Sequence, residues 1–195
     1  NKGTYEQAKA NFSDVVADLI TALAKIDKRY ELLQVKDCIF RLNRDVRFSK
    51  DKSPYKTHFG AAFSPGGKKS TKPGYYFHLD PEGCFTAAGC WMPEPDQLKR
   101  IRQEVDYNLK DFQRITNHKQ FMLRFGGLDQ DNKLVNAPKG YSDDNPAIDI
   151  LKLKSFTVTE KIDIKLVLDK QLVKGIMESF KAAKPFCDFI ENAME

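Results

Sequence analysis

The sequence predicts an α+β fold in which helices cover a mainly antiparallel sheet. Short segments of alternating apolar and polar residues form a meander between about residues 38 and 91, and apolar residues at helical spacing flank it. The chain has 195 residues, of which 41% are hydrophobic, enough for one domain with a sizeable core. No stretch has the composition of a linker, so we expect residues 1–195 to form a single domain.

The first expected element is a long amphipathic helix that runs to about Lys28. Thr4 and Gln7 have the spacing of a capping box, and apolar residues recur at helical spacing between Phe12 and Leu23. We interpret this apolar stripe as core packing.

The meander follows, and the alternation within it predicts which side chains share a face. Pairing Phe59 with Phe77 joins the apolar faces of two strands, and the same register places His58 opposite His78 and Gly60 opposite Tyr76 on the other face. The four expected strands are residues 38–42, 57–63, 75–80 and 84–91.

The second half of the chain is expected to be mainly helical. Helices are predicted from Pro95 to about residue 115, and over residues 118–125, 145–153, 172–183 and 186–194. Two short strands are predicted at residues 155–159 and 163–168.

Positive charge is concentrated in one part of the chain. Residues 36–75 contain ten basic and three acidic residues, a net of +7, whereas the whole chain carries only +5. Such a basic segment is typical of a site for an anionic partner. Lys68, Lys69 and Lys72 lie in a glycine- and proline-rich turn, and we interpret them as a solvated loop.

The densest basic run lies between Arg41 and His58, where arginine recurs at every third position. A guanidinium presents a fork of donors that fits carboxylate or phosphate, so several of them converging would form an anion site. The alternative is that arginines of this run pair with acids elsewhere, such as Asp143 or Asp144, and only fix a loop. The basic residues of the run are Arg41, Arg44, Arg47, Lys50, Lys52 and Lys56.

The run from Arg44 to His58, RDVRFSKDKSPYKTH, resembles the signature of domain-of-unknown-function family 2461, a group of hypothetical proteins. Members usually have an asparagine- and tryptophan-containing segment before the position of Asn1, so we expect such a segment to be missing here. Many members carry histidine at the position of Asn145, which weakens any assignment of a catalytic base there. The resemblance implies no particular activity. Further matches cover essentially the whole chain, at residues 74–78, 89–95, 98–102, 138–141, 145–148, 151–156 and 184–186.

Three functions remain open. The first is a site for a small phosphate- or carboxylate-bearing ligand, at which His58 or His78 would act as general base if a reaction occurs. The alternative for this pair is two strand histidines that only pack against each other. The expected ligand-binding residues are Arg41, Arg44, Arg47, Lys50, Lys52, Tyr55, Lys56, Tyr76 and Trp91.

The second function, a nucleic-acid-binding module, is less favoured because the overall charge of +5 is modest and no recognised motif is present. The third is a structural or protein-interaction domain in which the basic run forms ion pairs. The sequence indicates no oligomeric state.

Cysteine and histidine usage argues against a metal site. The four cysteines form no CxxC pair and lie mostly among apolar residues, so we expect buried free thiols in a reducing cytoplasm. The three histidines are scattered along the sequence, no nucleotide-cofactor fingerprint is present, and no apolar run could span a bilayer. We therefore expect a cytoplasmic protein with no metal, no cofactor and no membrane partner.

Overall fold

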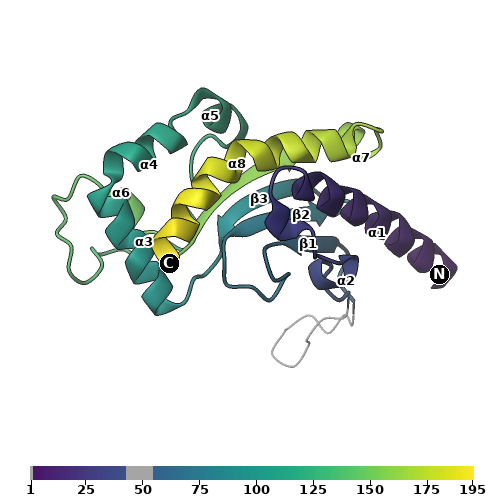
Figure 1. The fold of residues 1–195 in the computed structure, drawn as a ribbon, viewed down its shortest axis with the longest axis horizontal. Helices are drawn as coiled ribbons and strands as arrows, with labels where there is room; N and C mark the ends of the chain where they lie inside the picture. The colour runs from purple at the N-terminus through teal and green to yellow at the C-terminus, as the bar shows by residue number, and fades with distance from the viewer. Residues whose placement is uncertain (1, 43–54) are drawn as a thin grey trace. The chain divides into compact units, whose positions relative to one another are not determined.

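The computed structural model, which describes residues 2–42 and 55–195, confirms the α+β class. Four strands form one antiparallel sheet in the order β1-β2-β3-β4 (Figure 1). The strands are β1 (Phe59–Phe63), β2 (Gly74–Leu79), β3 (Cys84–Cys90) and β4 (Phe156–Ile162).

Helices occupy most of the remaining chain. Those before the sheet are α1 (Lys2–Ala24), the short 3-10 helix η1 (Lys28–Tyr30) and α2 (Val35–Cys38). Those that follow β3 are α3 (Pro95–Tyr107), α4 (Leu109–Thr116), α5 (Lys119–Phe125), α6 (Ile148–Leu151), α7 (Ile164–Val167) and α8 (Leu172–Met194).

The chain divides into two compact units. Unit 1 consists of Asn1–Ser70, Tyr75–Thr86 and Lys161–Glu178, and unit 2 consists of Thr71–Gly74, Ala87–Glu160 and Ser179–Glu195. The boundaries between the units fall inside β2, β3, β4 and α8 as well as between Ser70 and Thr71, so the division cuts continuous elements.

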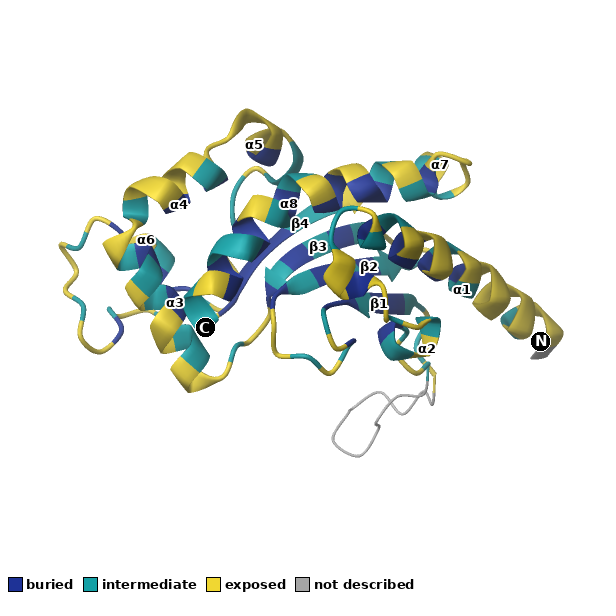
Figure 2. Ribbon diagram, in the orientation of Figure 1, coloured by how far each residue is buried: buried dark blue, intermediate teal, exposed yellow. Residues whose placement is uncertain are grey.

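In unit 1, α1 covers one face of the β1–β2 hairpin. Phe12 is 2% exposed, and its ring stacks on those of Phe59 and Phe77 at centroid distances of 5.2 and 5.8 Å. The buried positions of α1 follow the predicted helical spacing and form a dark stripe in Figure 2, whereas the opposite side of the helix is exposed. This packing leaves the other face of the hairpin for polar side chains.

The predicted hairpin register is wrong by two residues. Ala61 lies opposite Phe77 and Gly60 lies opposite His78. The turn begins directly after β1, where the Gly67 N–H donates to the Ser64 carbonyl at 2.7 Å, and this leaves Phe63 to pair with Tyr75. Because side chains alternate with a period of two, a shift of two residues leaves every side chain on its predicted face.

Unit 2 has an aromatic core. Phe112, Phe121 and Phe186 are at most 1% exposed, and Phe186 contacts the other two rings at centroid distances of 6.1 and 5.7 Å. Gly89 adopts a φ of +118°, and a Cβ there would lie 2.0 Å from the Phe156 carbonyl oxygen. Only glycine fits this close approach of β3 to β4.

Three predicted elements differ from the observed ones. The expected strand at 38–42 begins inside α2, and only Ile39 forms an isolated bridge, to Ala61. The expected strand at 163–168 is α7, because the Asp163 side chain accepts a hydrogen bond from the Lys165 N–H and caps a helix. The two expected C-terminal helices are one, α8, which continues through Pro185.

Candidate functional site

The polar face of the β1–β2 hairpin carries a cluster of histidine and carboxylate side chains. The strand period of two places Tyr76, His78 and Asp80 on this face, at the end of β2. The register, continued by one residue beyond β1, places His58 opposite Asp80. Side chains from two neighbouring chain segments therefore converge at one end of the hairpin.

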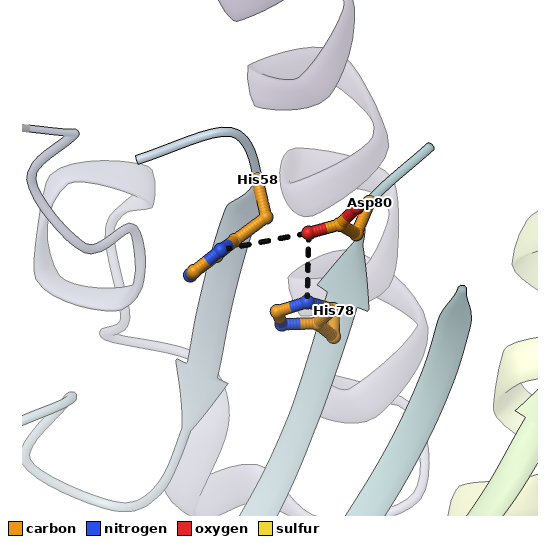
Figure 3. A group of neighbouring side chains, drawn as sticks. All are labelled: His58, His78 and Asp80. Atoms are coloured by element: carbon orange, nitrogen blue, oxygen red, sulfur yellow. Dashed lines mark ion pairs between the residues drawn. The ribbon is translucent and has the colours of Figure 1, made fainter. Parts of the chain in front are cut away.

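One carboxylate oxygen faces both imidazoles. Asp80 Oδ2 lies 3.7 Å from His58 Nδ1 and 3.7 Å from His78 Nε2, as the dashed lines in Figure 3 mark. The side chains of His58, His78 and Asp80 are 30%, 14% and 15% exposed, so the cluster is largely shielded but reachable from solvent. Within the described part of the chain, these three residues are the group whose donor atoms could hold a metal ion.

The Asp80 carboxylate is oriented by the turn that follows β2. Its Oδ1 atom accepts a hydrogen bond from the Glu82 N–H at 2.9 Å, while the Cys84 thiol lies 3.3 Å from the Asp80 carbonyl oxygen. With Oδ1 engaged by the turn, Oδ2 is the atom presented to the imidazoles.

Aromatic side chains hold the second imidazole in place. The ring of His78 stacks on Phe85 with a centroid distance of 4.5 Å and an interplanar angle of 17°. Its Nδ1 atom lies 3.0 Å from Tyr76 Oη, within hydrogen-bonding distance. His78 is therefore restrained through both its ring face and one of its ring nitrogens.

Gly60 leaves space for the side chain of Tyr76. A Cβ at Gly60 would lie 2.4 Å from Tyr76 Oη, so the phenol occupies the space that any other side chain would fill. Phe40 completes the aromatic wall with an edge contact to Tyr76 at a centroid distance of 6.2 Å.

The surroundings favour a neutral imidazole at position 78. The pKa of His78 is lowered, first because burial penalises the charged ring and then by the nearby His58 and Lys56, while Asp80 partly offsets the shift. Burial also raises the pKa of the Tyr76 hydroxyl, so this group remains protonated at neutral pH.

His58 and His78 do not lie directly opposite each other as predicted, yet their rings are in contact. Their ring centroids are 4.4 Å apart with an interplanar angle of 37°. The assignment of His58 and His78 as catalytic groups stays a prediction. Lys56, also expected at the site, places its ammonium 5.9 Å from the centroid of the Phe40 ring.

The remaining predicted ligand-binding residues are exposed or lie outside the described residues. Arg44, Arg47, Lys50 and Lys52 lie outside the described residues. Arg41 is exposed, Tyr55 is 59% exposed, and Trp91, which is 66% exposed, belongs to unit 2.

The acids named as alternative partners of the arginines have other contacts within unit 2. Asp143 forms an ion pair with Lys152 at 3.0 Å, and Asp144 accepts a hydrogen bond from the Ser142 hydroxyl. Of the turn lysines interpreted as solvated, Lys72 is 2.9 Å from Glu191 and the Lys68 ammonium donates to the Lys36 carbonyl, so only Lys69 fits that interpretation in full.

Sequence reasoning missed Asp80 as a site residue. Asp80 is the last residue of the expected strand at 75–80, and a register that pairs His58 with His78 leaves no place for it in the cluster. The alternation of Tyr76, His78 and Asp80 at every second position was the available signal, since residues so spaced share a face of a strand.

Together these features define an α+β protein whose antiparallel hairpin carries a half-buried histidine–carboxylate cluster on one face. The chain belongs to the conserved hypothetical protein family DUF2461, whose family model matches residues 1–189. Comparison with curated proteins gives no match, and neither does comparison with solved structures. None of the described helices combines the length and apolar character that crossing a bilayer requires.

Proposed function

We propose that the protein binds a small anionic ligand, bearing phosphate or carboxylate, at the end of the hairpin where His58 and His78 meet. The observation that carries the proposal is the contact between two partly exposed imidazoles at the end of the hairpin. Lys56 is close enough for its charge to lower the pKa of His78, and the two rings are in contact.

The His58 imidazole and the Lys56 ammonium have the donors to hold an anion. A neutral imidazole donates one N–H, and an ammonium donates up to three, with a charge that strengthens each hydrogen bond. The rings of Phe40, Tyr76 and Phe85 line the same face and would contact the organic part of such a ligand.

The Asp80 carboxylate sets a condition on this binding. It carries a negative charge beside the imidazoles, at 3.7 Å from each, and would repel an anion placed against it. The ligand must therefore be held on the side of Lys56, or its charge must be balanced by a cation bound at Asp80.

The test is a calorimetric titration of the whole chain with inorganic phosphate and with phenyl phosphate, repeated with the Lys56→Gln variant. We expect the variant to bind about tenfold more weakly or worse, because a hydrogen bond to a charged group is worth about 1.5–3 kcal/mol. Lys69→Gln is the matched control, since Lys69 is exposed and carries the same charge. Equal affinities for the two variants, or no binding by the unaltered chain, would refute the proposal.

A further inference from the structure

We propose that His58, His78 and Asp80 form a binding site for a divalent transition-metal ion such as Zn²⁺ or Co²⁺. The proposal stands on the geometry of these side chains and does not depend on the anionic ligand. It departs from the sequence-based expectation of no metal, because that expectation rested on the spacing of the histidines along the chain, whereas the fold brings two of them together with a carboxylate.

The donor distances are the first argument. A separation of 3.7 Å is too long for a hydrogen bond between an imidazole nitrogen and a carboxylate oxygen, which is about 2.7–3.2 Å. Two ligands that share one zinc ion, each at about 2.0–2.2 Å, lie about 3.3–3.7 Å apart. The spacing of Asp80 Oδ2 from each imidazole therefore suits a shared ion better than a direct contact.

The three donor atoms lie within 4.8 Å of one another, so a rotation of one ring would bring a wider pair to the spacing that a common ion requires. The two rings approach the carboxylate from neighbouring segments of one hairpin, and the fold thus fixes both directions of approach.

The surroundings of His78 match those of a metal ligand. An imidazole that binds a metal through one nitrogen usually donates its other N–H to a hydrogen-bond acceptor, which fixes the tautomer. Tyr76 Oη lies 3.0 Å from Nδ1, so it can accept that hydrogen bond while Nε2 faces Asp80. Tyr76 is thus a positioning residue for the proposed site.

The kind of ion follows from the ligand types. Two imidazoles and one carboxylate, without a thiolate, suit borderline divalent ions such as zinc, cobalt, nickel and iron(II). Three protein ligands leave at least one coordination position open, and the 30% exposure of His58 gives solvent access to it. A phosphate or carboxylate could occupy that position, with Lys56 beside it.

The experiment is a titration of the metal-stripped whole chain with Co²⁺, followed by calorimetry and by the visible absorption of the bound ion. We expect one ion per chain, and a loss of affinity of about a hundredfold or more in His58→Ala, His78→Ala and Asp80→Asn. Tyr76→Phe keeps all three ligands and should weaken binding by about 10- to 100-fold.

The controls separate a built site from general histidine or carboxylate binding. His118→Asn removes the remaining histidine of the chain, and Glu82→Gln removes an exposed carboxylate next to the site; both should bind Co²⁺ as the unaltered chain does. Asp80→Asn retains the Oδ1 acceptor for the Glu82 N–H, and its circular dichroism spectrum and urea midpoint show whether the fold is kept.

The outcomes for this site and for the anion site are distinguishable. Co²⁺ binding that is absent, or that survives Asp80→Asn and both histidine substitutions, overturns the metal site even if phosphate binds to the metal-stripped chain. Stoichiometric binding that the three substitutions abolish supports the metal site even if phosphate fails to bind.

Discussion

Replacing Gly60 by alanine should displace the Tyr76 hydroxyl and release His78. The new Cβ would lie 2.4 Å from Tyr76 Oη, whereas ordinary contact begins near 3.4 Å. The hydroxyl must therefore move by about 1 Å, and we expect this movement to break its hydrogen bond with His78 Nδ1, which is now 3.0 Å away.

The loss in the free energy of unfolding caused by Gly60→Ala can be worked out from these contacts. The lost hydrogen bond is worth about 0.5–1.5 kcal/mol, and crowding by one added methyl costs about 1 kcal/mol when the clashing atom is the end of a side chain. We expect the free energy of unfolding to fall by about 2 kcal/mol, and the midpoint of thermal unfolding by about 4–8 °C for a chain of this length.

A double-mutant cycle with Tyr76→Phe isolates the interaction. Without the hydroxyl, the nearest atom to the new Cβ is the ring Cζ at 3.1 Å, so Gly60→Ala should cost less than about 1 kcal/mol in that background. Urea denaturation gives the four free energies of unfolding, and nitrogen NMR shifts of the His78 ring report whether its tautomer changes. Equal costs in the two backgrounds, with an unchanged His78 tautomer, would show that the Tyr76 hydroxyl neither clashes with the new methyl group nor holds His78.

Three further predictions concern the rest of the chain. Gly89→Ala should lower the free energy of unfolding, measured by urea denaturation, by more than about 3 kcal/mol, because the new Cβ would lie 2.0 Å from a backbone atom, the Phe156 carbonyl oxygen. A smaller loss would mean that the strands can separate locally. Pro185→Ala should raise the free energy of unfolding by about 1–3 kcal/mol, because proline within a helix removes a backbone hydrogen bond, and a lower urea midpoint would contradict this. Burial raises the pKa of both Cys38 and Cys90 to about 11. At about pH 8, iodoacetamide should therefore leave both thiols unmodified in the native chain and alkylate them in urea, which mass spectrometry can show. Rapid alkylation of the native chain would contradict this prediction.

The parts of the fold that local patterns determine were predictable from the sequence. The helical spacing around Phe12 predicted α1, and the alternation of apolar residues predicted the strands on either side of the turn at residues 64–73. Gly126 ends α5 in the left-handed conformation, as its position after the apolar run indicated. Each of these signals lies within a few residues of the element that it specifies.

The parts of the fold that depend on packing could not be predicted from the sequence. The sequence predicts two helices, over residues 172–183 and 186–194, yet Phe180, Phe186 and Ile190 are all fully buried, and their shared burial favours one continuous helix. The sequence predicts a strand for each of residues 155–159 and 163–168, but the Asp163 cap makes the second segment helical.

The candidate site was found in part. Its face was predictable, because alternation alone places Tyr76 and His78 together with His58 and Gly60. The participation of Asp80 depended on register, which is fixed by the turn after β1 and not by the pairing of phenylalanines. A shift of two residues changed the partner of His58 from an imidazole to a carboxylate, and so changed the chemistry that the site can perform.

The proposed metal site is tested most directly by an anomalous difference map, at the zinc absorption edge, from crystals grown with Zn²⁺. We expect a single strong peak at about 2.0–2.2 Å from His58 Nδ1, His78 Nε2 and Asp80 Oδ2. A map with no peak among these three side chains, or with the two rings turned away from Asp80, would contradict it.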